Sequence, residues 1–114
     1  SPQKETEPAK EISAVLKPEC KQVLSENEMD KFRKKMVSTG SDQKMIDIVR
    51  KGIQSKCITT EQVKSLGALF LSDDGRYNFF NAVYPLVTDV NVFPSLESQL
   101  VDPVYKKRFR DLLK

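Results

Sequence analysis

The carboxylates between Ser72 and Tyr77 come nearer than other residues of this sequence to the pattern of a metal site. The stretch reads Ser-Asp-Asp-Gly-Arg-Tyr and resembles a calcium loop, in which oxygen ligands surround the ion on either side of a glycine turn. If Gly75 stands at that turn, Phe70 falls at the first ligand position and Asn81 at the last, and neither suits calcium there. Serine followed by aspartates is also typical of a helix start, where negative charge is stabilised. We therefore predict a helix start here, with no metal and no cofactor.

Paired carboxylates could also serve acid–base catalysis, and two pairs occur: Asp73 with Asp74, and Glu26 with Glu28. Each pair falls at a predicted helix start, which explains it without catalysis. The sequence contains no histidine, the side chain that most often acts as a general base near neutral pH. We predict that the protein is not an enzyme and has no catalytic residues.

The two cysteines, Cys20 and Cys57, are far apart in the sequence. Two cysteines without histidine fit no zinc pattern, and a nucleophilic Cys57 would lack a histidine partner. A disulfide, two buried thiols and one reactive thiol remain open, and we favour the disulfide. Ser1 is not a natural start, so we expect a chain that has lost a signal or anchor and reaches an oxidising compartment. A bond closing this loop would stabilise the fold by about 3–4 kcal/mol.

Two basic clusters could contact an anionic surface. Each surrounds an aromatic residue at helical spacing, Phe32 or Phe109, and their members are Lys31, Arg33, Lys34, Lys35, Lys106, Lys107, Arg108 and Arg110. A solvated helix face explains such clusters without a ligand. The net charge of +3 is small and no nucleic-acid motif is present, so we predict no nucleic-acid partner.

The length of 114 residues fits one domain, and 39% hydrophobic residues allow a modest core. No apolar run approaches the length of a membrane span. Residues 1–10 are polar and contain two prolines, and a possible short helix at 11–16 is interrupted by Pro18. Residues 1–19 are therefore predicted to form a linker or tail with a possible short helix. Residues 20–114 are predicted to form the helical domain, as a monomer.

Polar residues that suit helix N-caps recur along the domain, each followed by apolar residues at helical spacing. They are Ser25, Ser41, Thr59, Ser72, Ser95 and Asp102. Successive caps alternate as the first and second helix of three pairs, with residues 88–94 expected as an irregular loop. Because one pair cannot bury its apolar faces alone, the pairs must stack. The predicted fold is all-α, with three stacked helix pairs in a short array-like bundle.

The stretch 58–87 would form the central pair. Phe70 and Phe80 lie on its apolar stripes, which Leu71 widens, and Pro85 should end or kink the second helix. Glycines within the helical stripes, such as Gly52, cost about 1 kcal/mol against alanine, so we expect close helix contact there.

Residues along the domain also match the pattern of a known family. They are Phe32, the helix start 42–45, the stretch 57–63, Leu69 with Phe70, residues 82–84 and Asp89, and Cys20 matches an upstream cysteine. The chain therefore resembles DUF4476, a family of short exported bacterial helical domains of unknown function, over roughly the last four fifths of its length. The resemblance implies a helical domain, an envelope or extracellular setting and no known catalytic residues. Departures at residues 75–78 and at Val92 weaken any idea of a shared ligand surface.

From these observations we expect a non-enzymatic interaction or structural module of the bacterial cell envelope. Its partner would be a protein, peptide or glycan. The alternative is a basic surface that binds anionic polymers or membrane headgroups. The expected localisation is secreted, periplasmic or cell envelope, after removal of a signal peptide.

Overall fold

The computed structural model describes residues 22–114, and helices make up most of this part. In chain order they are α1 (Glu26–Val37), α2 (Asp42–Ile53), α3 (Thr60–Gly67), α4 (Asp73–Val83), the 3-10 helices η2 (Tyr84–Leu86) and η3 (Val90–Gln99), and α5 (Pro103–Leu112). The all-α prediction is confirmed. The tail at 1–19, its short helix and the domain start at residue 20 lie outside the described residues and stay predictions.

The helix starts follow the local cap chemistry. Ser25 and Thr59 each accept a hydrogen bond from the third residue of the helix, and Glu28 and Gln62 reach back to the cap N–H groups. Ser41 caps α2 and Ser72 caps α4 in the simpler way, with the serine oxygen alone. Asp102 caps α5, whose first residue is a proline. These starts confirm the predicted helices α1 to α5.

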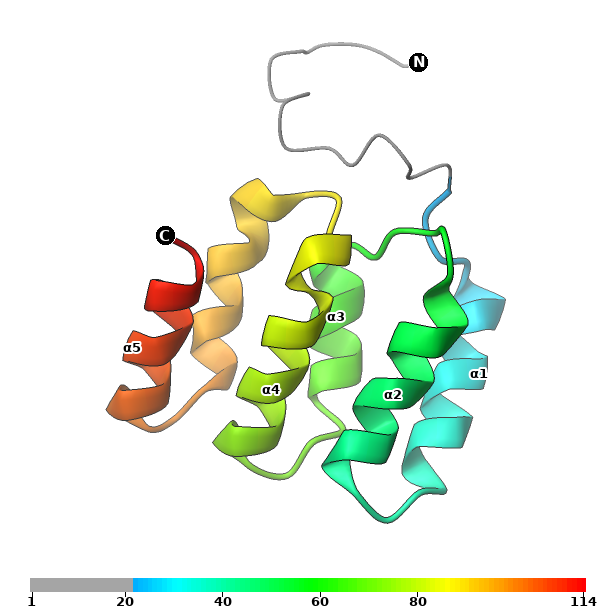
Figure 1. Cartoon of the computed structure of the whole chain (residues 1–114), viewed down its shortest axis with the longest axis horizontal. Helices are drawn as coiled ribbons and strands as arrows, with labels where there is room; N and C mark the ends of the chain where they lie inside the picture. The colour runs from blue at the N-terminus through cyan, green and yellow to red at the C-terminus, as the bar shows by residue number, and fades with distance from the viewer. Residues whose placement is uncertain (1–21) are drawn as a thin grey trace, which may run out of the picture.

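Figure 1 shows the helices as three pairs, α1 with α2, α3 with α4, and η3 with α5, placed side by side. One layer contains α2, α4 and α5, and the other contains α1, α3 and η3, which lies behind it in this view. The members of each pair are packed together, and α4 also packs against α2 and α5. Consecutive helices run in opposite directions, so the helices within one layer are parallel. The predicted stack of three pairs is confirmed.

The core is centred on α4. Phe79, Phe80 and Val83 have no solvent exposure. The ring of Phe80 lies 5.6 Å from that of Phe109 in α5 and 6.3 Å from that of Phe93 in η3, edge to face. Such aromatic pairs add stability beyond the burial of their area. The middle pair is therefore held by aromatic contact with the last pair, as expected of a helix with neighbours on both sides.

Proline and glycine mark the limits of regular packing. α4 ends at Val83, and Pro85 stands in the short helix η2, as the sequence predicts. A Cβ atom at Gly52 would lie 2.5 Å from Cε1 of Phe32, so α2 approaches α1 more closely there than alanine would allow. At Gly67 a Cβ atom would lie 3.0 Å from both Phe80 and Gln99. The close contacts expected of these helical glycines are confirmed.

Three short extended segments meet at the edge of the array where the pairs are joined. Isolated parallel bridges link Val23 to Cys57 and Ile58 to Val87. The N–H of Leu24 donates to the carbonyl of Cys57 at 3.0 Å, which fixes the entry of the chain into α1 beside the end of the first pair. Cys57 is buried at this edge. Cys20 lies outside the described residues, so its bond to Cys57 stays a prediction.

Two expectations about the third pair are wrong. Residues 90–99 form the 3-10 helix η3 instead of an irregular loop followed by a short helix, and Ser95 is not a cap: its hydroxyl donates to the carbonyl of Val92. Pro94 lacks the N–H that an α-helix would use, while a 3-10 helix repeats every three residues. Phe93 and Leu96 follow that repeat and are both buried.

Leu71 was expected to widen the apolar stripe of α3, and this is wrong, because the side chain is 94% exposed. α3 ends at Gly67 and the chain turns through residues 68–72, so Leu71 leaves the helical repeat. Among the described helices, no helix is both long and apolar enough to cross a membrane.

Candidate functional site

The polar residues of the calcium-like loop form hydrogen bonds at the start of α4 and to the backbone of the protein instead of binding a metal. Ser72 accepts a hydrogen bond from the N–H of Gly75 at 3.2 Å. The carboxylate of Asp73 accepts from the N–H groups of Val101 at 3.0 Å and of Asp102 at 2.6 Å, which joins the second pair to the third. Within residues 22–114, no group of three or more cysteine or acidic side chains is placed to hold a metal ion. The helix-start interpretation is confirmed.

The second carboxylate of that loop, Asp74, accepts a hydrogen bond from the hydroxyl of Tyr105 at 3.0 Å. This hydrogen bond is the main reason why the pKa of Tyr105 is raised. The guanidinium of Arg108 lies 4.8 Å from the ring centre of Tyr77 and 5.2 Å from that of Tyr105. Both aromatic faces therefore stabilise the arginine between α4 and α5.

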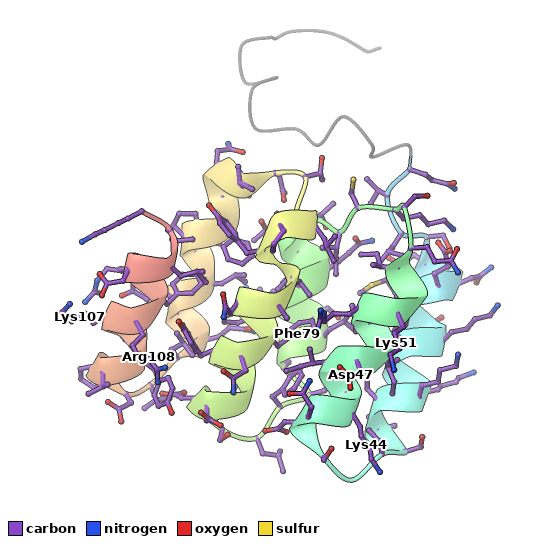
Figure 2. All side chains as sticks on the ribbon, viewed as in Figure 1. Lys44, Asp47, Lys51, Phe79, Lys107 and Arg108 are labelled. Carbon is purple, nitrogen blue, oxygen red and sulfur yellow. The ribbon has the colours of Figure 1, made fainter. Side chains whose placement is uncertain are left out.

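The two basic clusters lie on different helices at opposite ends of the array. Lys31, Lys34 and Lys35 are exposed on α1, and Phe32 between them is buried, as predicted. Figure 2 shows Lys107 and Arg108 on α5, at the far end from α1. The structure therefore does not bring the two clusters together into one surface.

Most members of the α5 cluster already have acidic or aromatic partners. Arg110 is paired with Glu97 at 2.6 Å and Lys107 with Asp111 at 3.2 Å. The hydrogen bond from Lys107 lowers the pKa of Asp111. Charges already paired in this way are less available for an anionic ligand than lone lysines.

Glu28 and Lys56 form an ion pair that the sequence did not reveal. Glu28 belongs to the cap of α1, and Lys56 lies in the connection between the first two pairs. The hydrogen bond from Lys56, assisted by that from the Ser25 N–H, lowers the pKa of Glu28 to about 2. This pair fastens the start of α1 to the segment that carries Cys57.

A groove of about 440 Å³ lies between α1 and α3, and we take it as the candidate binding site. α1 and α3 belong to the same layer and run in the same direction, behind α2 and α4 in Figure 1. Met29 of α1 provides a buried apolar wall, while Ser65 of α3 and Ala68, which follows the end of α3, present only small side chains. Small residues on one wall leave room that larger side chains would fill.

Arg33 joins the two walls of the groove. Its guanidinium donates to Asp30 on its own helix at 2.6 Å and to the hydroxyl of Ser65 on α3 at 2.9 Å. Arg33 therefore leaves the basic cluster in which the sequence placed it and faces the groove instead. The other cluster members on α1 do not line the groove.

The acidic and the basic residues of the groove lie at different positions along the helix axes. Glu26 and Glu61 stand in the first turns of α1 and α3, so both lie at the same end, while Arg33 and Lys64 lie farther along. Glu26, Glu61 and Lys64 form no ion pair with another residue of the range 22–114. Their exposed side chains are therefore available to a ligand.

Gln99, at the end of η3, lines the groove as well. Its Nε2 donates to the carbonyl of Lys64 at 3.2 Å, while its Oε1 is buried and has no hydrogen-bond partner among the described residues. A buried acceptor without a partner is uncommon in folded proteins. A Cβ atom at Gly67 would lie 3.0 Å from Oε1, so this oxygen packs closely against the backbone of α3.

Sequence reasoning missed most of the groove, because its walls come from three separate helices. It treated Glu61 only as part of a helix start and did not single out Lys64, Ser65 or Gln99. One signal was present: Ser65 and Ala68 are small residues three positions apart on a helix face that the apolar stripe leaves open.

The family comparison agrees with the helical domain described above. The chain matches the family described as Domain of unknown function (DUF4476) over residues 23–113. The chain belongs to this family. The DUF4476 match covers every described helix and the groove. Neither the curated proteins nor the solved structures gave a match.

Proposed function

We propose that this DUF4476 chain is a non-enzymatic binding module that holds a peptide segment of a partner protein in the groove between α1 and α3. The groove itself carries the proposal, because it combines an apolar wall with unpaired charges of both signs. Ligand sites commonly combine apolar walls with a few placed polar groups.

An enzymatic role has less support from the residues of the groove. The chain has no histidine, and the groove contains no cysteine. Its acidic residues, Glu26 and Glu61, are exposed at helix starts, where negative charge is stabilised without any catalytic role. These features favour binding over catalysis.

We further propose that the protein works outside the cytoplasm, in the envelope or beyond it, with Cys20 bonded to Cys57. The parallel bridge between Val23 and Cys57 supports this pairing, because it brings the chain just after Cys20 to the side of Cys57. Three residues span at most about 10 Å, so a bond from Cys20 to Cys57 is within the reach of the chain before Val23. A disulfide persists in oxidising compartments.

The experiment that tests the groove uses a random peptide library displayed on phage. Ala68→Trp places a large ring in the groove, while Asn81→Trp places the same ring on an exposed position of α4, in the other layer. We expect peptides enriched on the unmodified protein to bind the Asn81 variant equally and to lose binding to the Ala68 variant. Equal binding to both variants would remove the groove as the site.

A second candidate function is attraction to anionic polymers or membrane headgroups, and the exposed Lys31, Lys34 and Lys35 of α1 favour it. None of the three forms an ion pair within the described part of the chain. Binding to anionic vesicles or DNA that weakens steeply with salt, and is lost when these lysines are changed to glutamate, would support this candidate. Peptide binding that is unaffected by the same changes would favour the groove.

A further inference from the structure

We infer that the groove between α1 and α3 selects an extended peptide segment that carries one positive and one negative side chain, one to three residues apart. This inference rests on the proposed function and adds the chemistry of the ligand. It follows from where the unpaired charges of the groove lie along the two parallel helices.

The negative end of the groove is defined by Glu26 and Glu61. Glu26 is the first residue of α1, and Glu61 is the second residue of α3. Helix N-termini carry a positive partial charge of about half a unit each, which offsets only part of two full carboxylate charges. This end therefore stays negative and suits a lysine or arginine side chain of a ligand.

The basic residues of the groove lie farther along the same two helices. Lys64 follows Glu61 by three residues and Arg33 follows Glu26 by seven, which corresponds to about 4.5 and 10.5 Å along the helix axes. Arg33 shares its charge with Asp30, whereas Lys64 has no acidic partner among the described residues. An aspartate or glutamate of the ligand is therefore expected beside Lys64.

The distance along the helix axes between the acidic and the basic residues of the groove sets the distance between the two charges of the ligand. An extended chain rises about 3.3 Å per residue, so the range from about 4.5 to 10.5 Å corresponds to one to three residues. A compact anion such as phosphate would meet Lys64 but would be repelled by the glutamates at the other end. A polyanion would be repelled in the same way, so the mixed-charge peptide is the occupant that the charges favour.

The part of the groove between the acidic and the basic residues suits a peptide. Ser65 and Ala68 leave space along this side of the groove, and Met29 provides an apolar surface for side chains of the peptide.

The test uses three peptides of equal length with blocked ends, made from glycine, serine and alanine apart from two charged residues. One carries lysine and glutamate with two residues between them, one carries two lysines, and one carries two glutamates. Amide chemical shifts of the labelled protein measure each affinity. We expect the mixed peptide to bind at least about tenfold more tightly than either other peptide, with shifts at Ser65 and Ala68.

Reversing the charge of a groove residue should change which of the three peptides binds most tightly. With Glu61→Lys the peptide with two glutamates should become the tightest ligand, and with Lys64→Glu the peptide with two lysines should. Asp47→Lys and Lys51→Glu make the same charge changes on the outer side of α2, where Figure 2 shows both residues, and should leave the preference unchanged. All four sites lie on helix surfaces outside the buried core, so folding is expected to survive, and a circular dichroism spectrum checks it.

Some results would overturn the inference without touching the proposed function. If displayed peptides lose binding to the Ala68→Trp protein while the mixed peptide has no advantage over the others, the groove binds peptides but does not select their charges. Equal or tighter binding of the two-glutamate peptide to the unmodified protein would overturn the inference in the same way. If the Ala68 change has no effect on displayed peptides, the proposed function itself fails.

Discussion

Cε1 of Phe32 lies 2.5 Å from the position that a Cβ atom would take at Gly52, so the first helix pair packs ring against backbone. This contact holds α1 on α2 and so positions one wall of the groove. It also explains why a glycine stands within a helix, where alanine alone would be favoured by about 1 kcal/mol.

We predict that Gly52→Ala destabilises the protein by about 1 kcal/mol, because an overpacking cost of 1–3 kcal/mol exceeds the gain in helix propensity. Gly40→Ala is the control, since nothing lies within 4 Å of a Cβ atom there, and it should change stability by less than about 0.5 kcal/mol. Urea melts measure both. A Gly52 variant as stable as the unmodified protein would show that the ring moves aside freely.

Phe70→Ala and Phe80→Ala should each cost about 3–5 kcal/mol, since both rings are buried in the middle of the array. Leu71→Ala, one position beyond Phe70, should cost less than about 0.5 kcal/mol because the leucine is 94% exposed. Denaturant melts of the three variants compare buried and exposed apolar groups at adjacent positions. A loss below about 1 kcal/mol for both phenylalanines would contradict the register of the central pair.

The helix starts could be predicted from the sequence because their chemistry is local. Ser25 and Glu28, or Thr59 and Gln62, meet within one turn, and no distant residue is needed. η3 could not be predicted from the same signals, because a 3-10 repeat of three and an α-helical repeat of 3.6 look alike over so few residues. Leu71 was wrongly placed on the apolar stripe because α3 ends at Gly67, before the turn at 68–72, and the apolar spacing does not show this end.

The groove could not be predicted because it depends on how far apart two helices stand. Gln99 and Lys64 meet across 35 positions of sequence, and Arg33 meets Ser65 across 32. The periodicity of apolar residues does not predict such contacts between residues far apart in the sequence. The sequence did reveal that α1 and α3 each carry charged residues, but it did not place Glu26 and Glu61 at one end and Lys64 at another level.

Stability should fall in acid partly through Glu28. Its pKa is about 2 in the folded protein and 4.5 when unperturbed, so its contribution is fully present above about pH 4.5 and is lost as the pH falls towards 2. Glu28→Gln keeps a capping amide but removes the charge, and it should flatten the decline of stability between pH 5 and pH 2. Urea melts across this range make the comparison. An equally steep decline in the glutamine variant would show that other carboxylates dominate.

The bond between Cys20 and Cys57 should appear in the intact mass of protein prepared without reductant, as the loss of two hydrogens. Cys57→Ser in the oxidised state should cost about 3–4 kcal/mol, through the greater freedom of the unfolded chain, and adding reductant to the unmodified protein should have a similar effect. Two free thiols after oxidative refolding would remove the bond and with it much of the argument for an oxidising compartment.

The most direct test of the groove is an NMR titration of the labelled full chain with the tightest peptide selected from the displayed library. We predict that the largest amide shifts fall on the α1 and α3 walls, at Met29, Ser65 and Ala68, and at Gln99 of η3. α2 and the outer side of α5 should change little. Shifts concentrated on α2 and α5, with these four residues unmoved, would contradict the assignment of the groove as the binding site.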